Sequence, residues 1–275
     1  MKIVTFCLSD ERSRPGVLLE DGIVDLSAQG FGSVLDLIAS GKTPEAGVAR
    51  IPLERTRLLA PIESPQRIFC IGLNYRDHAI ESKMEIPAVP TVFLKLPSSV
   101  TGPGSPIVLP KNSTQPDYEA EFAVVIGKGG FRIPTEAWRK HVFGYTIVND
   151  VSARDVQLAT SQWILGKSFP TFCPMGPAIV TADAIADPLE LEIRLDIDGV
   201  EMQHSNTREL IFRVPELIAY ISSITPLEPG DIISTGTPQG VGLGRKPQRW
   251  LQPGETVTIA IEGLGKLVNR TEAET

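Results

Sequence analysis

The sequence has few cysteines, no long apolar run and no block of basic residues. Cys7, Cys70 and Cys173 lie far apart, without CxxC spacing or the density of a secreted disulfide scaffold, so we expect reduced thiols in the core. No segment approaches the ~20 apolar residues that cross a membrane, and charged residues from Asp10 to Arg12 come before a signal-type stretch could form. These absences predict a soluble, cytoplasmic protein that does not contact membranes.

Basic residues are outnumbered by acidic ones. Lys and Arg total 26 and Asp and Glu total 33, which gives a net charge of -7 and no basic block that could follow a phosphate backbone. We therefore expect no nucleic-acid partner. The 275 residues are 42% hydrophobic, enough for a full core, and the 24 glycines and 23 prolines are spread among short β-rich runs. This composition favours a strand-rich fold.

Residues 1–61 are predicted to form a small N-terminal domain. It has a strand at Lys2 to Leu8, a hairpin over Gly16 to Asp25 and a helix around Ser33 to Ser40. Two prolines then lead into an apolar strand that opens the main domain, residues 62–275. The small domain carries no obvious chemistry.

The main domain combines many strands with few helices, which indicates the α+β class. Strands are predicted at Arg67 to Gly72, Tyr118 to Ile126, Val142 to Val148, Ala178 to Thr181, Leu189 to Ile197, Asp231 to Ser234 and Glu255 to Ile261. Helices are predicted after Tyr75, from Ser152 and around Val214 to Ser223.

One predicted strand carries two acidic side chains on the same face. In Tyr118 to Ile126, alternate apolar residues face one way while Glu119 and Glu121 face the other. Asp150 ends the apolar strand Phe143 to Asn149, and strand ends commonly gather functional groups. Two close glutamates on a half-buried face repel each other unless a cation offsets their charge. The alternative is a solvent-facing strand edge.

The three carboxylates form an all-oxygen ligand set without histidine or thiolate. Such a set suits Mg²⁺, Mn²⁺ or Ca²⁺ and argues against Zn²⁺ or Cu²⁺. We predict that Glu119, Glu121 and Asp150 bind Mg²⁺ or Mn²⁺, with water and substrate oxygens completing the coordination sphere.

A histidine and a glutamate three residues apart suggest a general base. With His78 and Glu81 at this spacing, the carboxylate can orient the imidazole and raise its basicity. A surface salt bridge would have the same spacing and is the alternative.

Other polar side chains point to an anionic substrate. Arg154 and Gln157 are three residues apart on the helix predicted from Ser152, whose Ser-x-x-Asp sequence is a capping-box pattern, so both could reach an anion. A solvated helix face is the alternative. Lys167 lies between apolar residues, either as a buried electrostatic stabiliser or as a loop lysine with a buried stem.

The glycine-rich stretch Gly236 to Gly244 does not fit a nucleotide site. It matches neither G-x-G-x-x-G nor G-x-x-x-x-G-K-[ST], and Pro247 interrupts any following helix. Its backbone can approach a ligand closely, and Thr237 adds a hydroxyl. The alternative is a plain connection of several turns.

In order along the chain, these segments resemble the fumarylacetoacetate hydrolase family over roughly Arg67 to Val268. The matching runs are G-x-N-Y-x-x-H-x-x-E at Gly72 to Glu81, Phe93-Leu94-Lys95, D-Y-E-x-E at Asp117 to Glu121, N-D-x-[ST]-x-R-D-x-Q at Asn149 to Gln157, G-K-S-F at Gly166 to Phe169 and G-T-P at Gly236 to Pro238. The first run is similar to that of the acylpyruvase and 2-oxo-acid branch.

The resemblance implies a strand-rich β-roll catalytic domain, preceded by a small N-terminal domain, in a homodimer. It implies that the three carboxylates bind the metal, that His78 and Glu81 activate water, and that Lys167 stabilises developing charge. It also implies a set of substrate-binding residues, namely Tyr75, Lys95, Arg154, Gln157 and Thr237.

The expected reaction is metal-dependent hydrolysis of a C–C bond in a 2,4-dioxo acid of the acylpyruvate, fumarylpyruvate or diketo sugar acid type. The products would be a carboxylate and a 2-oxo acid. One alternative is a decarboxylase or lyase of the oxaloacetate or ureidoglycolate type, which needs the same enolate stabilisation; for oxaloacetate, no attacking water is needed. Another is a non-catalytic protein that binds carboxylates or metal and has no need of an intact His78 and Glu81 pair.

Overall fold

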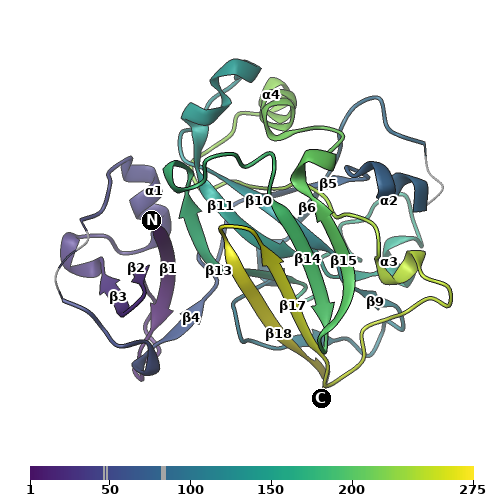
Figure 1. Cartoon of the computed structure of the whole chain (residues 1–275), viewed down its shortest axis with the longest axis horizontal. Helices are drawn as coiled ribbons and strands as arrows, with labels where there is room; N and C mark the ends of the chain where they lie inside the picture. The colour runs from purple at the N-terminus through teal and green to yellow at the C-terminus, as the bar shows by residue number, and fades with distance from the viewer. Residues whose placement is uncertain (46, 48, 82–84) are drawn as a thin grey trace.

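The computed structural model describes residues 1–45, 47, 49–81 and 85–275, which Figure 1 shows as a strand-rich α+β fold. Its largest sheet has eleven strands in the order β3-β2-β1-β13-β11-β10-β16-β5-β6, with β4 beside β1 and β7 beside β13. These strands are β1 (Lys2–Cys7), β2 (Arg14–Leu19), β3 (Gly22–Asp25), β4 (Arg57–Leu59), β5 (Ile68–Gly72), β6 (Thr91–Lys95), β7 (Val100–Thr101), β10 (Ala120–Ile126), β11 (Val142–Asn149), β13 (Cys173–Thr181) and β16 (Ile232–Ser234).

A second sheet of five strands packs on one face of the first (Figure 1). Its order is β15 (Val200–Asn206), β14 (Glu192–Ile197), β17 (Thr256–Ile261), β18 (Gly265–Ala273) and β8 (Ile107–Leu109). The core between the sheets joins Phe122 of β10 and Ile147 of β11 to Leu195 of β14 and Ile259 of β17. The predicted alternation along β10 is confirmed, because Ala120, Phe122, Val124 and Ile126 all belong to this core.

Helices are short and lie outside the sheets (Figure 1). They are α1 (Val34–Ser40), α2 (Arg76–Glu81), α3 (Arg154–Gln157) and α4 (Val214–Ile224). Single 3₁₀ segments cover Ser27–Gln29, Leu53–Arg55, Pro97–Ser99, Thr135–His141, Ala182–Ala184, Thr207–Glu209 and Gly242–Gly244. In the part of the chain that the structure describes, no helix has the length and apolar character needed to span a membrane.

The capping-box prediction at Ser152 is wrong. Ser152 and Ala153 form a short strand, β12 (Ser152–Ala153), that pairs with β9 (Pro116–Asp117), and α3 begins only at Arg154. The hydroxyl of Ser152 donates to the carbonyl of Asp150 and does not cap the helix. Arg154 and Gln157 nevertheless share one side of α3, as predicted, because the helix still completes one turn.

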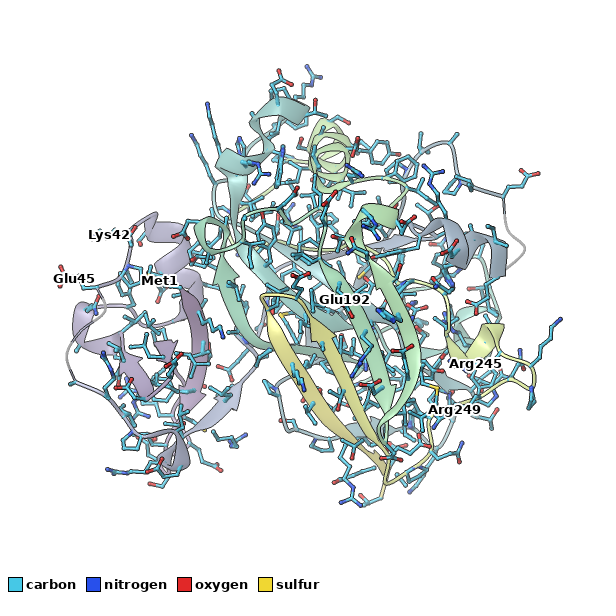
Figure 2. All side chains as sticks on the ribbon, viewed as in Figure 1. Met1, Lys42, Glu45, Glu192, Arg245 and Arg249 are labelled. Atoms are coloured by element: carbon cyan, nitrogen blue, oxygen red, sulfur yellow. The ribbon has the colours of Figure 1, made fainter. Side chains whose placement is uncertain are left out.

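The strands of the N-terminal unit, β1 to β4, form one end of the main sheet. β1 pairs with β13, and Ser33 caps α1 by accepting the backbone N–H of Asp36. Apolar side chains of α1 belong to the same core as Val125 and Val148, on the face of the main sheet opposite to the β14 sheet. The domain boundary between residues 61 and 62 stays a prediction. Figure 2 places Met1 and Lys42 of this unit on the opposite side of the molecule from Arg245.

Candidate active site

Strand pairing brings the three predicted metal ligands together. Glu121 lies in β10, Glu119 directly precedes it, and Asp150 directly follows β11. Because the register pairs Ala120 with Asn149, the start of β10 lies beside the end of β11. The backbone N–H of Asp150 donates to the carbonyl of Glu119 at 2.9 Å. One oxygen from each carboxylate lies within 4.8 Å of the others, and all three side chains are buried. The E-x-E pair is therefore not on a solvent-facing strand edge.

Two lysines neutralise part of this buried charge. Nζ of Lys167 donates to Glu119 at 2.5 Å and to Asp150 at 2.8 Å, and Nζ of Lys95 donates to Asp150 at 2.6 Å. Burial alone would raise the pKa of Glu119, but Arg154 and Lys167 beside it lower that pKa below its ordinary value. Glu119 is therefore ionised throughout the physiological range.

Glu121 lacks such a counter-charge. It accepts hydrogen bonds from the hydroxyl of Ser234 at 2.6 Å and the backbone N–H of Gly236 at 3.0 Å, and within the described ranges it forms no ion pair. Burial, Asp150 and Glu119 together raise its pKa well above the ordinary value. A hard divalent cation would supply the missing positive charge to an all-oxygen donor set. The residues present therefore fit Mg²⁺ or Mn²⁺.

The predicted acid-base pair lies on α2. Nδ1 of His78 is 3.3 Å from Oε2 of Glu81, and the side chain of His78 is 11% exposed. Both oxygens of Glu81 also accept the backbone N–H of Gly240, at 3.1 and 3.2 Å, so the carboxylate joins α2 to the glycine-rich loop. The pair is thus built into the fold and is not an isolated surface salt bridge.

The guanidinium of Arg154 donates a hydrogen bond from each of its three nitrogen atoms. Its Nε donates to Asp117 at 2.8 Å, Nη1 to Gln157 at 2.9 Å and Nη2 to Glu119 at 2.6 Å. A guanidinium has five N–H groups, and these three hydrogen bonds are the ones it donates within the described residues. Two N–H groups therefore remain for a ligand.

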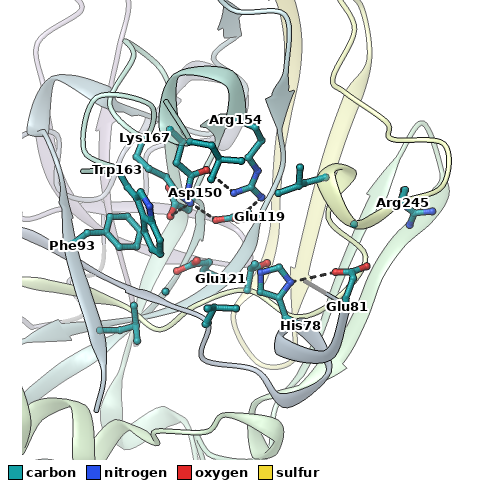
Figure 3. Close-up of a pocket in the computed structure, with 18 of the residues that line it drawn as sticks. His78, Glu81, Phe93, Glu119, Glu121, Asp150, Arg154, Trp163, Lys167 and Arg245 are labelled. Carbon is teal, nitrogen blue, oxygen red and sulfur yellow. Dashed lines mark hydrogen bonds and ion pairs between the residues drawn. The ribbon is translucent and has the colours of Figure 1, made fainter. Parts of the chain in front are cut away.

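One cavity of about 560 Å³ collects these groups. Every predicted site residue except Tyr75 and Lys95 lines it: His78, Glu81, Glu119, Glu121, Asp150, Arg154, Gln157, Lys167 and Thr237. The hydroxyl of Thr237 accepts a hydrogen bond from Gln203 at 2.8 Å, which leaves its own proton for a ligand. Figure 3 shows the acid-base pair on one side of the carboxylates and Phe93 with Trp163 on the other.

Tyr75 and Lys95 do not line the cavity, and their predicted contact with substrate has no support in this geometry. Lys95 is 2% exposed and donates to Asp150 and to the carbonyls of Val151 and Lys167, so it supports a predicted metal ligand from outside the cavity. Tyr75 is fully buried, and burial raises the pKa of its phenol. Its hydroxyl has no hydrogen-bond partner within the described residues.

Sequence reasoning assigned no role to two features of the site. Asp117 lies inside the D-Y-E-x-E run, but nothing local shows that it holds Arg154. In the apolar wall of Phe93, Leu158 and Trp163, only Phe93 belongs to a run that carries the resemblance, and that run gave it no role. Leu158 and Trp163 have no sequence signal, because single apolar residues resemble ordinary core residues.

The fold and the site define a strand-rich enzyme with a buried acidic centre. The family model of the fumarylacetoacetate (FAA) hydrolase C-terminal domain matches residues 67–272. The chain belongs to the fumarylacetoacetate hydrolase family. The β-roll fold class predicted from the sequence is confirmed.

Named relatives and solved structures resemble this chain over nearly all of its length. A Xenopus laevis protein named oxaloacetate tautomerase fahd2, mitochondrial, is 43% identical over 98% of this chain and 89% of its own length. The structure of a fumarylacetoacetate hydrolase from Exiguobacterium antarcticum has a TM-score of 0.91 and 38% identity, covering all of both chains. Maleylpyruvate hydrolase from Sphingobium sp. SYK-6, solved with Mn²⁺ and pyruvate, has a TM-score of 0.84 and 31% identity, again over all of both chains.

Two expectations change with these findings. The expected cytoplasmic location is wrong, because close relatives, including the Xenopus laevis protein, are named mitochondrial. The expectation of C–C bond hydrolysis has less support than its oxaloacetate alternative, because the same relative is named for oxaloacetate tautomerisation.

Proposed function

We propose that this protein is a divalent-cation-dependent enzyme that interconverts the keto and enol forms of oxaloacetate or a closely related 2-oxo acid. The observation that carries the proposal is a single cavity with an acid-base pair, His78 and Glu81, beside three buried carboxylates. The name of the Xenopus laevis relative supports the choice of substrate. Tautomerisation needs a proton moved at one carbon, which a positioned imidazole can do without attacking water.

Each group has a distinct task in this proposal. Bound to Glu119, Glu121 and Asp150, Mg²⁺ or Mn²⁺ would polarise the 2-oxo carbonyl and acidify the neighbouring C–H group. The imidazole of His78 takes a proton from carbon 3 and then gives one to the 2-oxo oxygen, so the imidazole returns to its starting state and no atom is gained or lost overall. Glu81 keeps the imidazole oriented.

The substrate carboxylate needs its own binding partners. The two N–H groups of Arg154 that remain, together with Gln157 and Thr237, supply donors for an anion. Lys167, whose pKa is raised by Asp150 and Glu119 despite its burial, stays protonated and balances charge that develops on the substrate.

The test is to follow the absorbance of enol-oxaloacetate with purified protein, with and without Mn²⁺. We expect metal-dependent loss of the enol signal faster than the uncatalysed rate. A lactate dehydrogenase coupled assay on the same samples detects pyruvate and therefore decarboxylation. If the enol decays at the uncatalysed rate with metal present, the proposed reaction is wrong.

Hydrolysis of 2,4-dioxo acids is the second candidate. Maleylpyruvate hydrolase of Sphingobium sp. SYK-6, with its similar fold, favours it. In that reaction His78 of this chain would take a proton from water, as predicted from the sequence, and not from carbon 3. Release of a 2-oxo acid from acylpyruvates, measured with the same metal, separates the two reactions.

We propose that the protein assembles as a homodimer through β6. This strand ends the main sheet. Val92 and Leu94 on it are 37% and 39% exposed, and Leu96, directly after it, is 41% exposed. An open edge with exposed apolar residues favours pairing with another chain. Analytical ultracentrifugation of the parent and Leu94→Lys tests this, and an unchanged dimer in the variant argues against this edge.

A further inference from the structure

The cavity has an apolar wall that the proposed reaction does not use. Phe93 and Trp163 line one side of it, and Leu158, which also lines the cavity, is 58% exposed. Oxaloacetate carries a carboxylate at each end and little apolar surface to cover such a wall. A cavity of about 560 Å³ also falls within the roughly 300–1,000 Å³ range of pockets that enclose much larger ligands.

The wall is held firmly beside the charged centre. The rings of Phe93 and Trp163 meet edge to face with 5.5 Å between centroids, and Nζ of Lys167 lies 5.2 Å from the centroid of Phe93. A Cβ added at Gly72 would lie 2.6 Å from Cζ3 of Trp163, so the indole packs directly against the backbone of β5. The aromatic surface therefore has a fixed position relative to Glu119 and Asp150.

A strained residue adds to the same cavity. Leu73 lines it with a φ of 51°, in the left-handed region that glycine adopts at much lower cost. Strain of this kind persists where the surrounding structure enforces it and is frequent in ligand sites. The fold thus places a leucine side chain at the cavity in a backbone conformation that glycine would adopt with less strain.

We propose that the cavity binds 2-oxo acids that carry an aromatic or similarly planar apolar arm, with the arm against Phe93, Leu158 and Trp163. This inference rests on the proposed function, because the 2-oxo-acid end must bind at the carboxylates and at Arg154. The third substituent on the 2-oxo carbon then extends along the cavity. Figure 3 shows that the aromatic pair and His78 lie on different sides of the carboxylates, so the arm beyond carbon 3 would pack against the aromatic pair while carbon 3 itself stays beside the carboxylates, on the side of His78.

Two stable probes that differ only in the arm test the inference. N-phenyloxamate and N-methyloxamate share a carboxylate beside a carbonyl, which mimics a 2-oxo acid, and differ by phenyl against methyl. Titration calorimetry with the Mn²⁺-loaded full chain measures the Kd of each, and oxalate, which has no arm, reports on the carboxylate end alone. In the parent, N-phenyloxamate should bind about 10-fold or more tightly than N-methyloxamate.

Substitutions in the apolar wall test where the arm binds. Leu158→Ser and Trp163→Ala should each weaken N-phenyloxamate binding about 10-fold while changing the Kd of oxalate less than about 2-fold. Leu158 is exposed, so its variant tests the proposal even if loss of the indole disturbs folding. Matched controls are Leu165→Ser and Phe131→Ala, which remove a 68% and a 50% exposed apolar side chain outside the cavity lining.

The calorimetry distinguishes failure of this inference from failure of the proposed function. If oxalate does not bind the Mn²⁺-loaded parent, the proposed function is wrong and the inference fails with it. If oxalate binds but the two oxamates bind equally, the wall does not hold a substrate arm. Equal losses for oxalate and N-phenyloxamate in Leu158→Ser and Trp163→Ala would also overturn the inference, because the wall would then only support the metal centre.

Discussion

The fully buried carboxylate of Asp117 accepts a 2.8 Å hydrogen bond from Nε of Arg154. The same carboxylate accepts the backbone N–H groups of Gly242 at 2.7 Å and Leu243 at 3.0 Å. Asp117 does not line the cavity, but it joins a proposed substrate-binding side chain to a loop whose Leu243 lines the cavity. We propose that Asp117 is a positioning residue that acts through Arg154.

A double-mutant cycle tests this relationship. Asp117→Asn and Arg154→Lys should each raise the Kd of oxalate about 10-fold, because each disturbs the same guanidinium, and the double variant should lose little more. The coupling should fall within about 0.5–3 kcal/mol. Asp155→Asn is the control, since Asp155 accepts from Ser113 and Thr114 away from the cavity. Additive losses would show that Asp117 acts independently of Arg154.

Metal binding should raise thermal stability. Because the cation binds the folded chain, Mn²⁺ at about 100 times its Kd should add about 2.7 kcal/mol, which corresponds to a rise in Tm of roughly 5–10 °C for a chain of this size. Differential scanning fluorimetry with and without chelator measures it. Ca²⁺ should raise Tm less if the site favours smaller ions. The same Tm at all Mn²⁺ concentrations would remove the metal site from the proposal.

Glu121→Gln should change how stability depends on pH. The raised pKa of Glu121 means that the folded, metal-free protein binds this proton more tightly than the unfolded chain does. This contribution to stability is complete below the ordinary glutamate pKa of 4.5 and is lost as pH rises through the higher folded-state pKa. The variant should therefore unfold at higher urea concentration than the parent at neutral pH without metal, and gain nothing from Mn²⁺.

Glu20→Gln is the matched control for this change, because Glu20 is exposed in the turn between β2 and β3. Urea titrations at several pH values, with chelator present, give both profiles. If the parent and Glu121→Gln lose stability in parallel as pH rises, Glu121 does not hold a proton in the folded state.

His78→Ala should separate chemistry from binding. Loss of a general acid-base group lowers a rate by about 10²–10⁴-fold, so enol-oxaloacetate turnover should fall by that factor. The Kd values of Mn²⁺ and oxalate should stay within about 2-fold, since the carboxylates and Arg154 are unchanged. His204→Ala, which removes an exposed histidine, is the control. Turnover at the parent rate in His78→Ala would exclude this imidazole from the reaction.

Local patterns in the sequence predicted much of the carboxylate end of the site. The period of two along β10 placed Glu119 and Glu121 on one face, and the spacing of three placed His78 near Glu81 and Arg154 near Gln157. These relationships depend on the geometry of one strand or one helical turn, which neighbouring residues determine. The end of β11 at Asp150 could be located in the same way.

Contacts between distant segments could not be predicted. Asp117 accepts a hydrogen bond from Gly242, which is 125 positions away in the sequence, and Lys95 donates one to Asp150, which is 55 positions away. The sequence also gave no sign of short strands such as β12, because Ser152 and Ala153 form a strand only when Pro116 and Asp117 lie beside them. Such pairings depend on tertiary structure, which overrides local propensity.

The basic side chains around the carboxylates have a consequence for the order of events during biosynthesis. Arg154, Lys95 and Lys167 neutralise Asp117, Glu119 and Asp150 from within the chain, and a bound proton can neutralise Glu121. The polypeptide can therefore complete its core before any ion arrives. In the proposed enzyme, metal loading would then be a separate, reversible step on the folded chain, and the ion supply of the compartment would determine how much of the protein is active.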